Sequence, residues 1–315
     1  MLKQCKMCGE PASVRLPYAR LSLCPKHFTE YVERHVRNTI RRYKLIKNGD
    51  RVVLAISGGK DSLALLHILN SLRGEFGFEL SALNIDLGIK KDDYSLRAVQ
   101  ISEKYCGELG IELVKVDMKR DFGFTIDEVF SSKQVRRPIC SSCGVIKRYV
   151  TNKVAVELGA SSLATGHNLD DESTVLLSNY VKADIDLLVR SGPILPSWGD
   201  RMISRIKPLY ETSEKEITLY NFFKGIQYLE QKCPYASGAS TLKLKEVVNA
   251  LEEEWVGSKI ALVRSFNKKI KPILADHYSK NSKDIYLCEV CGYPTSTKIC
   301  SFCRLKKSVS KTAKI

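Results

Sequence analysis

Long apolar runs are absent from this 315-residue chain, and its first ten residues, MLKQCKMCGE, contain no apolar core. A membrane-spanning helix needs roughly 18–20 apolar residues in succession, and a secretion signal needs a shorter apolar segment near its start. The sequence offers neither pattern. We therefore expect a cytoplasmic protein with no part in a membrane.

Acidic residues are few: the chain has 35 Asp and Glu against 50 Lys and Arg, which gives a formal net charge of +15. With 44% hydrophobic and 27% charged residues, the composition excludes a largely disordered chain. The excess positive charge predicts a polyanionic partner, with nucleic acid first and an anionic membrane second. Charge alone also allows a basic protein without a specific partner.

Cysteine, in contrast, is plentiful, with 11 residues. Because cytosolic thiols are kept reduced, we read their spacing for metal sites rather than for disulfides. The first set, C-x2-C-x15-C-x2-H, comprises Cys5, Cys8, Cys24 and His27, and the second, C-x2-C-x8-C-x2-C, comprises Cys288, Cys291, Cys300 and Cys303. Four such ligands fill a tetrahedral zinc ion and leave no position for water, so two structural zinc knuckles are predicted. Catalytic or redox cysteines are the alternative.

Three further cysteines lie between these knuckles: Cys140 and Cys143 in CSSCG, and Cys233 in QKCPYAS. One chemistry that fits is a relay, in which low-pKa thiols carry persulfide sulfur or resolve a disulfide. Another is an iron–sulfur cluster with one iron left open to a non-protein ligand. Spacing does not decide between them, and zinc is a third option. Cys106 is predicted to be a small buried residue of a helix.

Strands alternate with helices through the middle of the chain. The predicted strands are 51–57, 78–89, 111–118 and 161–167, and the predicted helices are 63–72, 94–109, 143–158 and 171–181. This order predicts an α/β fold with a doubly wound parallel sheet, whose ligands bind at the carboxyl ends of the strands. We divide the chain into an N-terminal knuckle (1–28), a connecting basic helix and the α/β domain (29–211), a helical region that completes the catalytic site (212–284), a C-terminal knuckle (285–305) and a basic tail (306–315).

Two basic segments flank this core. The predicted helix at 29–47 carries six cations, Arg34, Arg37, Arg41, Arg42, Lys44 and Lys47. They form either a solvated face or a face turned toward phosphates. The basic tail is expected to be loose.

The first strand runs into SGGKDS (57–62), which precedes a helix. Glycines let the backbone approach phosphate, the helix N-terminus offers unpaired N–H groups, and Lys60 adds a cation. The loop is not a Walker A motif, because Leu54 stands where a glycine is needed and Asp61 follows the lysine. It resembles instead the PP-loop, S-G-G-x-D-S, of the ATP pyrophosphatase superfamily, whose members cleave ATP between the α and β phosphates.

A second element, GHNLDDE (166–172), resembles another motif of that superfamily. With Asp170 and Asp171 beside it, His167 has a predicted role in binding ATP and Mg²⁺. Asp171 is the stronger candidate ligand, whereas Asp170 could equally be the N-cap of the following helix. The candidate ATP-binding residues are Ala55, Ser57, Gly58, Gly59, Lys60, Asp61, Ser62, Ile85, Gly166 and Asp171.

The motifs occur in one order along the chain: SGGKDS, CSSCG-x2-KRY, GHNLDD, RIKPL (205–209) and CPYA (233–236), between two knuckles. The whole resembles the TtuA-type tRNA 2-thiouridine synthetases, relatives of the cytosolic wobble-uridine thiolases. The resemblance implies a PP-loop domain between two zinc knuckles and a 4Fe–4S cluster on Cys140, Cys143 and Cys233. It also implies tRNA as substrate, and sulfur from a ubiquitin-like carrier ending in a thiocarboxylate or from free sulfide. Many relatives are dimers, so a homodimer is a further expectation.

By the same resemblance, ATP adenylates O2 of a tRNA uridine, and sulfur then displaces AMP. Lys60, Asp61 and Asp171 would act at the ATP, and Lys147 of the KRY element would be a second cation near the α-phosphate. His27, in place of a fourth cysteine, resembles the T-loop enzymes more than the wobble enzymes. The alternatives are a lysidine synthetase or amidotransferase, which would not need three inner cysteines, and an RNA-binding zinc protein, which would leave both loops without a role.

Overall fold

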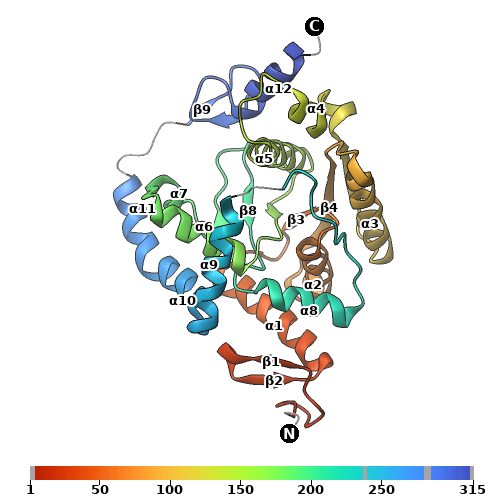
Figure 1. Ribbon diagram of the computed structural model, residues 1–315, viewed down its shortest axis with the longest axis vertical. Helices are drawn as coiled ribbons and strands as arrows, with labels where there is room; N and C mark the ends of the chain where they lie inside the picture. The colour runs from red at the N-terminus through yellow and green to blue at the C-terminus, as the bar shows by residue number, and fades with distance from the viewer. Residues whose placement is uncertain (1–3, 237–239, 280–284, 313–315) are drawn as a thin grey trace.

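The computed structural model describes residues 4–236, 240–279 and 285–312. The molecule is elongated, with the two knuckles at opposite ends and the α/β domain between them (Figure 1). In the part of the chain that is described, no helix is both long and apolar enough to cross a membrane.

The central sheet has six strands in the order β5-β4-β3-β6-β8-β7. Their bounds are β3 (Arg51–Ile56), β4 (Glu79–Asp86), β5 (Leu113–Asp117), β6 (Ser162–Ala164), β7 (Ile194–Leu195) and β8 (Ser204–Ile206). All neighbouring pairs are parallel except β7 with β8. The predicted α/β fold with a parallel sheet is confirmed, with one antiparallel strand added at an edge.

Helices cover both faces of the sheet. They are α1 (Pro25–Tyr43), α2 (Lys60–Phe76), α3 (Tyr94–Glu108), α4 (Ile126–Ser131), α5 (Ile139–Glu157), α6 (Leu169–Val181), α7 (Ile185–Val189), α8 (Glu214–Lys224), α9 (Ser240–Glu254), α10 (Ser258–Ser265), α11 (Lys271–Ser279) and α12 (Ser301–Thr312). Along β3, Leu54 and Ile56 pack in the core that includes α2, whereas Val53 packs in the core that includes α5. This alternation is what successive strand residues dictate, and Figure 1 shows α2 and α5 on opposite sides of the sheet.

The connecting helix begins earlier than predicted, at the N-terminal knuckle itself. Cys24 is the N-cap of α1 and Pro25 its first residue, so helix and knuckle share residues. The helix ends at Tyr43, because Lys44 adopts a left-handed conformation with φ of 52°. The knuckle also contains a hairpin of β1 (Val14–Leu16) and β2 (Leu21–Leu23).

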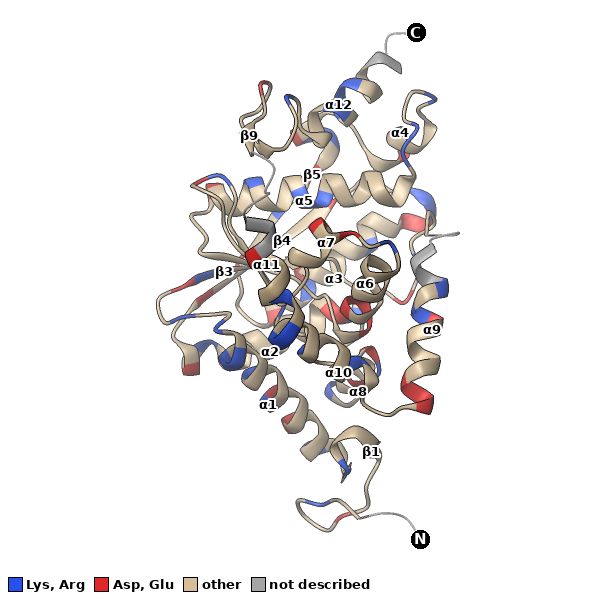
Figure 2. Ribbon diagram, turned by 90° about the vertical axis from the view of Figure 1, so that its left-hand side faces the viewer, with Lys and Arg blue, Asp and Glu red and all other residues tan. Residues whose placement is uncertain are grey.

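The cations of α1 are largely paired within the protein. Arg37 and Arg41 both contact Glu75 of α2, at 2.9 and 2.8 Å, and Arg42 contacts the buried Glu211 at 2.5 Å. Figure 2 shows basic and acidic residues interspersed on this helix. Half of the six predicted cations therefore already have a carboxylate partner, which makes α1 a weaker candidate for a phosphate-binding face.

The expectation of a loose C-terminal tail is wrong as far as Thr312. Residues 301–312 form α12, and Phe302, Leu305 and Val309 are buried. Their spacing of three and four places them on one face of the helix. Phe302 stacks on Tyr149 of α5, with ring centroids 3.9 Å apart and planes 6° from parallel. The C-terminal knuckle, with β9 (Tyr286–Leu287) and β10 (Pro294–Thr295), is thereby attached to α5.

Candidate active site

The SGGKDS loop joins the carboxyl end of β3 to the start of α2, as predicted. Gly58 has φ of +71°, and a Cβ there would lie 2.9 Å from the carbonyl oxygen of Ala98, so only glycine fits. Gly59 is the N-cap of α2 and has no side chain to satisfy the first N–H groups. The side chain of Ser62 accepts from Ser57 N at 3.2 Å and donates to Gly59 O at 2.9 Å, which closes the loop. The open N–H groups at a helix start suit phosphate.

The second loop, after β6, packs directly on the first. A Cβ on Gly166 would lie 3.1 Å from backbone atoms of Asp61 and Ser62, so glycine allows the close approach. Asn168 Nδ2 then donates to Asp61 Oδ1 at 2.9 Å. Asn168 lies within the GHNLDDE motif but is not among the predicted site residues, and its contact links the two loops.

The proposal that Asp170 caps the following helix is wrong. The N-cap of α6 is Asn168, which forms a capping box with Asp171 three residues later. Asp170 is buried and accepts from Lys259 Nζ at 2.6 Å and from Glu214 N at 2.8 Å. It therefore anchors the helical region to the α/β domain.

Both loops border a cavity of about 370 Å³. Of the predicted ATP-binding residues, Ala55, Ser57, Gly59, Asp61, Ser62, Ile85, Gly166 and Asp171 line it. Lys147 and His167 also line it. The other two predicted ATP-binding residues, Gly58 and Lys60, do not line the cavity. Lys60 points toward Glu214 of the helical region instead.

Lys60 belongs to a network of alternating charges. Its Nζ lies 2.7 Å from Glu214 and 3.0 Å from Asp61. Glu214 also contacts Lys245 at 2.6 Å, and Lys245 reaches Asp171 at 3.2 Å. Burial opposes ionisation of Glu214, but hydrogen bonds from Lys245 and Lys60 lower its pKa to about 2. Glu214 is therefore ionised at neutral pH, and the network connects α8 and α9 to both nucleotide loops.

We expect Glu214→Gln to lower the free energy of unfolding by about 1–3 kcal/mol at pH 7, because two partly buried cations lose their shared carboxylate. Denaturant unfolding of both proteins measures the change. Since the folded pKa lies below the ordinary value of Glu, this stabilisation is present above about pH 4.5 and is lost as the pH falls toward 2. The matched control is Glu79→Gln, whose pair with Arg51 is exposed and should contribute less than about 1 kcal/mol.

Cations gather on another part of the cavity wall. Lys147 and Arg148 come from α5, Arg205 from β8, and His167 from the second loop. Although His167 is partly exposed to solvent, desolvation by the surrounding atoms and the charges of Lys207 and Arg205 lower its pKa. The imidazole is therefore neutral at pH 7, and its Nδ1 lies 2.9 Å from the hydroxyl of Thr165. It can offer a hydrogen bond to a nucleotide but no charge.

The three inner cysteines converge beside this cavity. Cys140 and Cys143 both lie in the first turns of α5, which begins four residues before the predicted start, and Cys140 Sγ lies 3.5 Å from the carbonyl oxygen of Tyr235. Burial raises the pKa of Cys143, and charge on Cys233 and Cys140 raises it further, although Lys147 and Arg148 lower it. The effect of these two cations on the pKa of Cys143 is smaller than that of burial. Tyr94 lines the cavity, and burial raises its pKa, as does charge on the nearby Cys233 and Cys143. These two cysteines therefore lie close to the cavity wall.

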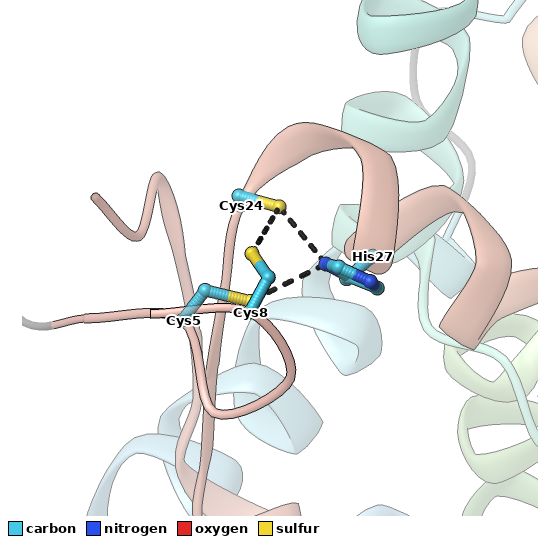
Figure 3. Close-up of side chains that lie close together, drawn as sticks. All are labelled: Cys5, Cys8, Cys24 and His27. Atoms are coloured by element: carbon cyan, nitrogen blue, oxygen red, sulfur yellow. Dashed lines mark hydrogen bonds between the residues drawn. The ribbon is translucent and has the colours of Figure 1, made fainter. Parts of the chain in front are cut away.

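The N-terminal knuckle brings its four predicted ligands together (Figure 3). His27 Nδ1 lies 3.2 Å from Cys24 Sγ and 3.6 Å from Cys5 Sγ, and Cys8 Sγ lies 3.8 Å from Cys24 Sγ. Although burial opposes it, backbone hydrogen bonds lower the pKa of Cys5 to about 6. Thiolates held by N–H groups around one point are a fitting donor set for zinc.

The C-terminal knuckle has the same arrangement. The ligand atoms of Cys288, Cys291, Cys300 and Cys303 all lie within 4.8 Å of one another. The N–H of Cys300 donates to Cys288 Sγ at 3.2 Å, and backbone hydrogen bonds, against burial, lower the pKa of Cys288 to about 6. Cys106 is buried in α3 and is a core residue, as expected.

Comparison with known proteins identifies the family. Residues 28–236 match the PP-loop domain, and residues 4–29 match the N-terminal LIM domain of 2-thiouridine synthetase TtuA. The tRNA-5-methyluridine(54) 2-sulfurtransferase of Pyrococcus horikoshii is 41% identical, over 98% of this chain and 96% of that protein, and the enzyme of that name from Thermus thermophilus is 39% identical over 98% and 93%. A solved structure of the U34-tRNA thiolase NcsA from Methanococcus maripaludis, with its [4Fe-4S] cluster, has a TM-score of 0.81 and 30% identity over 98% of this chain and 97% of that one. The chain therefore belongs to the TtuA-type tRNA 2-thiouridine synthetases of the PP-loop superfamily.

Proposed function

We propose that this protein converts uridine 54 in the T-loop of tRNA to 2-thiouridine, using ATP to activate the uridine. The observation that carries the proposal is the position of two nucleotide loops and Lys147 around one cavity, with three cysteines close to Lys147 and to the cavity wall. The choice of uridine 54 rests on relatives named for that position at 41% and 39% identity, against 30% for a thiolase named for U34. Wobble-uridine thiolation is the second candidate.

The first half-reaction would be adenylation. O2 of the uridine attacks the α-phosphorus of ATP, the α–β bond breaks, and pyrophosphate leaves. N–H groups at the start of α2 bind the phosphates, and Lys147 stabilises negative charge developing at the α-phosphate. Asp61 and Asp171 both line the cavity and offer carboxylate oxygens, the ligands that Mg²⁺ prefers. When bound, the ion would neutralise phosphate charge.

The second half-reaction would be sulfur transfer. A sulfur nucleophile attacks C2, the C2–O bond breaks, and AMP leaves with the oxygen that was O2 of the uridine. The donor set of Cys140, Cys143 and Cys233 would suit a 4Fe–4S cluster, because the three cysteines lie near one another beside the cavity, and a cluster held by three thiolates would have one iron without a protein ligand. Such a cluster, when bound, would hold sulfide deprotonated at that open iron. The sulfide would come from a ubiquitin-like thiocarboxylate carrier or from solution.

An isotope experiment tests the sequence of bond changes. A tRNA transcript carrying ¹⁸O at O2 of uridine 54 is incubated anaerobically with ATP, Mg²⁺ and sulfide, and the AMP is analysed by mass spectrometry. We expect one ¹⁸O per AMP and one sulfur per tRNA. AMP without ¹⁸O would contradict adenylation of the uridine. Thiolation of a transcript with cytidine at 54 but not of one with cytidine at 34 would favour the wobble position.

We further propose that each knuckle binds a structural zinc ion. Metal analysis should find about two zinc ions per chain, following one ion for each set of four ligands. Cys5→Ser and Cys288→Ser should each lose about one zinc and become less stable or less soluble, because structural zinc contributes folding free energy. Cys106→Ser, which changes a buried cysteine outside both knuckles, is the control and should keep both ions. Full zinc content in both knuckle variants would refute the assignment.

A further inference from the structure

Two arginines in the cavity wall have no acidic partner. Arg148 lies on α5 and Arg205 on β8, and both line the cavity. The Nε of Arg205 is buried and makes no hydrogen bond. Among the described residues, no carboxylate forms an ion pair with either guanidinium. Other arginines of this chain, such as Arg42 and Arg264, pair with a buried glutamate.

An unpaired guanidinium group that is partly withdrawn from water is costly, and this applies to the half-buried Arg205, whereas Arg148 is exposed to solvent. Arginine stays protonated at any physiological pH, so it cannot escape burial by losing its charge. Burial lowers the pKa of Arg205, and so does the charge of Arg148 beside it. A cation that loses water without gaining a partner favours an anion, so Arg205, with Arg148 beside it, offers a site for an anion that enters the cavity.

The position of the two arginines distinguishes them from the phosphate-binding loop. The side chains close enough to affect the pKa of Arg148 include Tyr293, Arg137 and Cys143. Those close enough to affect the pKa of Arg205 include Tyr293 and Arg148. A Cβ on Gly144 would lie 3.2 Å from Arg148 Nη1, so the glycine next to Cys143 leaves room for this guanidinium. The pair therefore sits toward the inner cysteines and the C-terminal knuckle, whereas ATP phosphates have their own N–H groups at the start of α2.

We propose that Arg148 and Arg205 together bind a phosphodiester of the tRNA immediately next to the target uridine. The inference rests on the proposed function, since a uridine whose O2 lies between the α-phosphate and the sulfur must bring its own backbone phosphates to this part of the wall. The planar fork of arginine binds two phosphate oxygens at once, and two forks fix the position of the nucleotide as well as its affinity. A base drawn out of the T-loop would be positioned by this clamp.

A neutral linkage tests the clamp directly. In synthetic tRNA, the phosphodiester on the 5′ or the 3′ side of the target uridine is replaced by an uncharged methylphosphonate. For the wild type, one of the two replacements should weaken tRNA binding about tenfold. Arg205→Gln and Arg148→Gln should each weaken binding of unmodified tRNA by a similar factor and reduce the slope of log affinity against log salt by about 1.

The decisive measurement is the combination. If the arginines contact that phosphate, the variants have already lost the contact. The methylphosphonate should therefore lower their tRNA affinity little further. The proposal would be overturned if, for both linkages, the factor by which the methylphosphonate lowers tRNA affinity were the same in the variants as in the wild type. It would also be overturned if the variants weakened ATP binding but not tRNA binding. Arg51→Gln, at the opposite end of β3, is the matched control and should behave as wild type. Thermal unfolding checks each variant, and Arg148→Gln, on the less buried side chain, serves where Arg205→Gln does not fold.

The proposed function can fail separately from this clamp. Absence of ¹⁸O transfer to AMP in the wild type would refute adenylation of the uridine whatever the arginines do. Normal ¹⁸O transfer with no coupling between the methylphosphonate and either variant would refute the clamp alone.

Discussion

Replacing Cys143 with alanine should abolish thiolation, with a fall of at least about 10³-fold, or roughly 4 kcal/mol in the barrier. The reason is that Cys140 and Cys143 of α5 and Cys233, about ninety residues away in sequence, come together beside the cavity and form the proposed cluster site. Anaerobic visible absorption and iron analysis should show a depleted cluster. Binding of ATP should remain, because the cysteines do not line the nucleotide cavity.

Cys106→Ala is the matched control for this prediction, since it removes a buried thiol from α3 and should retain both iron and activity. A thiol relay makes a different prediction: iron-free wild type would thiolate tRNA, and oxygen exposure under reducing conditions would leave its rate unchanged. If iron-stripped protein turns over at the rate of reconstituted protein, the cluster proposal is wrong and the relay replaces it.

Lys60→Ala should slow adenylation by about 10²–10³-fold, the usual cost of losing one group that stabilises transition-state charge. Lys60 now contacts Glu214, and binding of ATP would exchange that carboxylate for phosphate. Lys245 remains beside Glu214 after the exchange, so the carboxylate stays paired. Release of pyrophosphate from ATP in the presence of tRNA measures the effect.

Lys153→Ala controls for the loss of a lysine as such, because Lys153 forms an exposed pair with Glu157 within α5 and lies over the ring of Phe122, and it does not line the cavity. It should leave the rate of pyrophosphate release within about twofold of wild type, as expected for a surface pair. A folded Lys60→Ala protein with near-normal adenylation would remove Lys60 from the ATP site.

Local patterns predicted the parts of the site that lie within one loop. The turn after β3 needs Gly58 and Gly59, and each knuckle has two pairs of ligands with only two residues between the members of a pair, so sequence spacing alone places these groups together. The tail was misjudged because its charge is more conspicuous than the apolar spacing of Phe302, Leu305 and Val309. That spacing was the available signal for α12.

Contacts between distant segments could not be predicted in the same way. Glu214 and Lys245 belong to ordinary amphipathic helices, and nothing nearby in sequence marks them as neighbours of Lys60 and Asp171. Their meeting depends on how α8 and α9 dock on the α/β domain. The same holds for Arg205, because its lack of a partner becomes visible only when the whole environment is known.

The first half of α5 sets a fixed distance in the reaction. Cys140, Cys143 and Lys147 lie three and four residues apart on one face of this helix, so Cys143 and Lys147 are separated by about 6 Å along its axis, at about 1.5 Å per residue. The helix thus fixes the spacing between the proposed cluster ligands and Lys147, the proposed cation at the α-phosphate. Stacking of Phe302 on Tyr149 fixes the rotation of α5 about its own axis. A movement of the C-terminal knuckle would therefore shift both groups together and leave their separation unchanged.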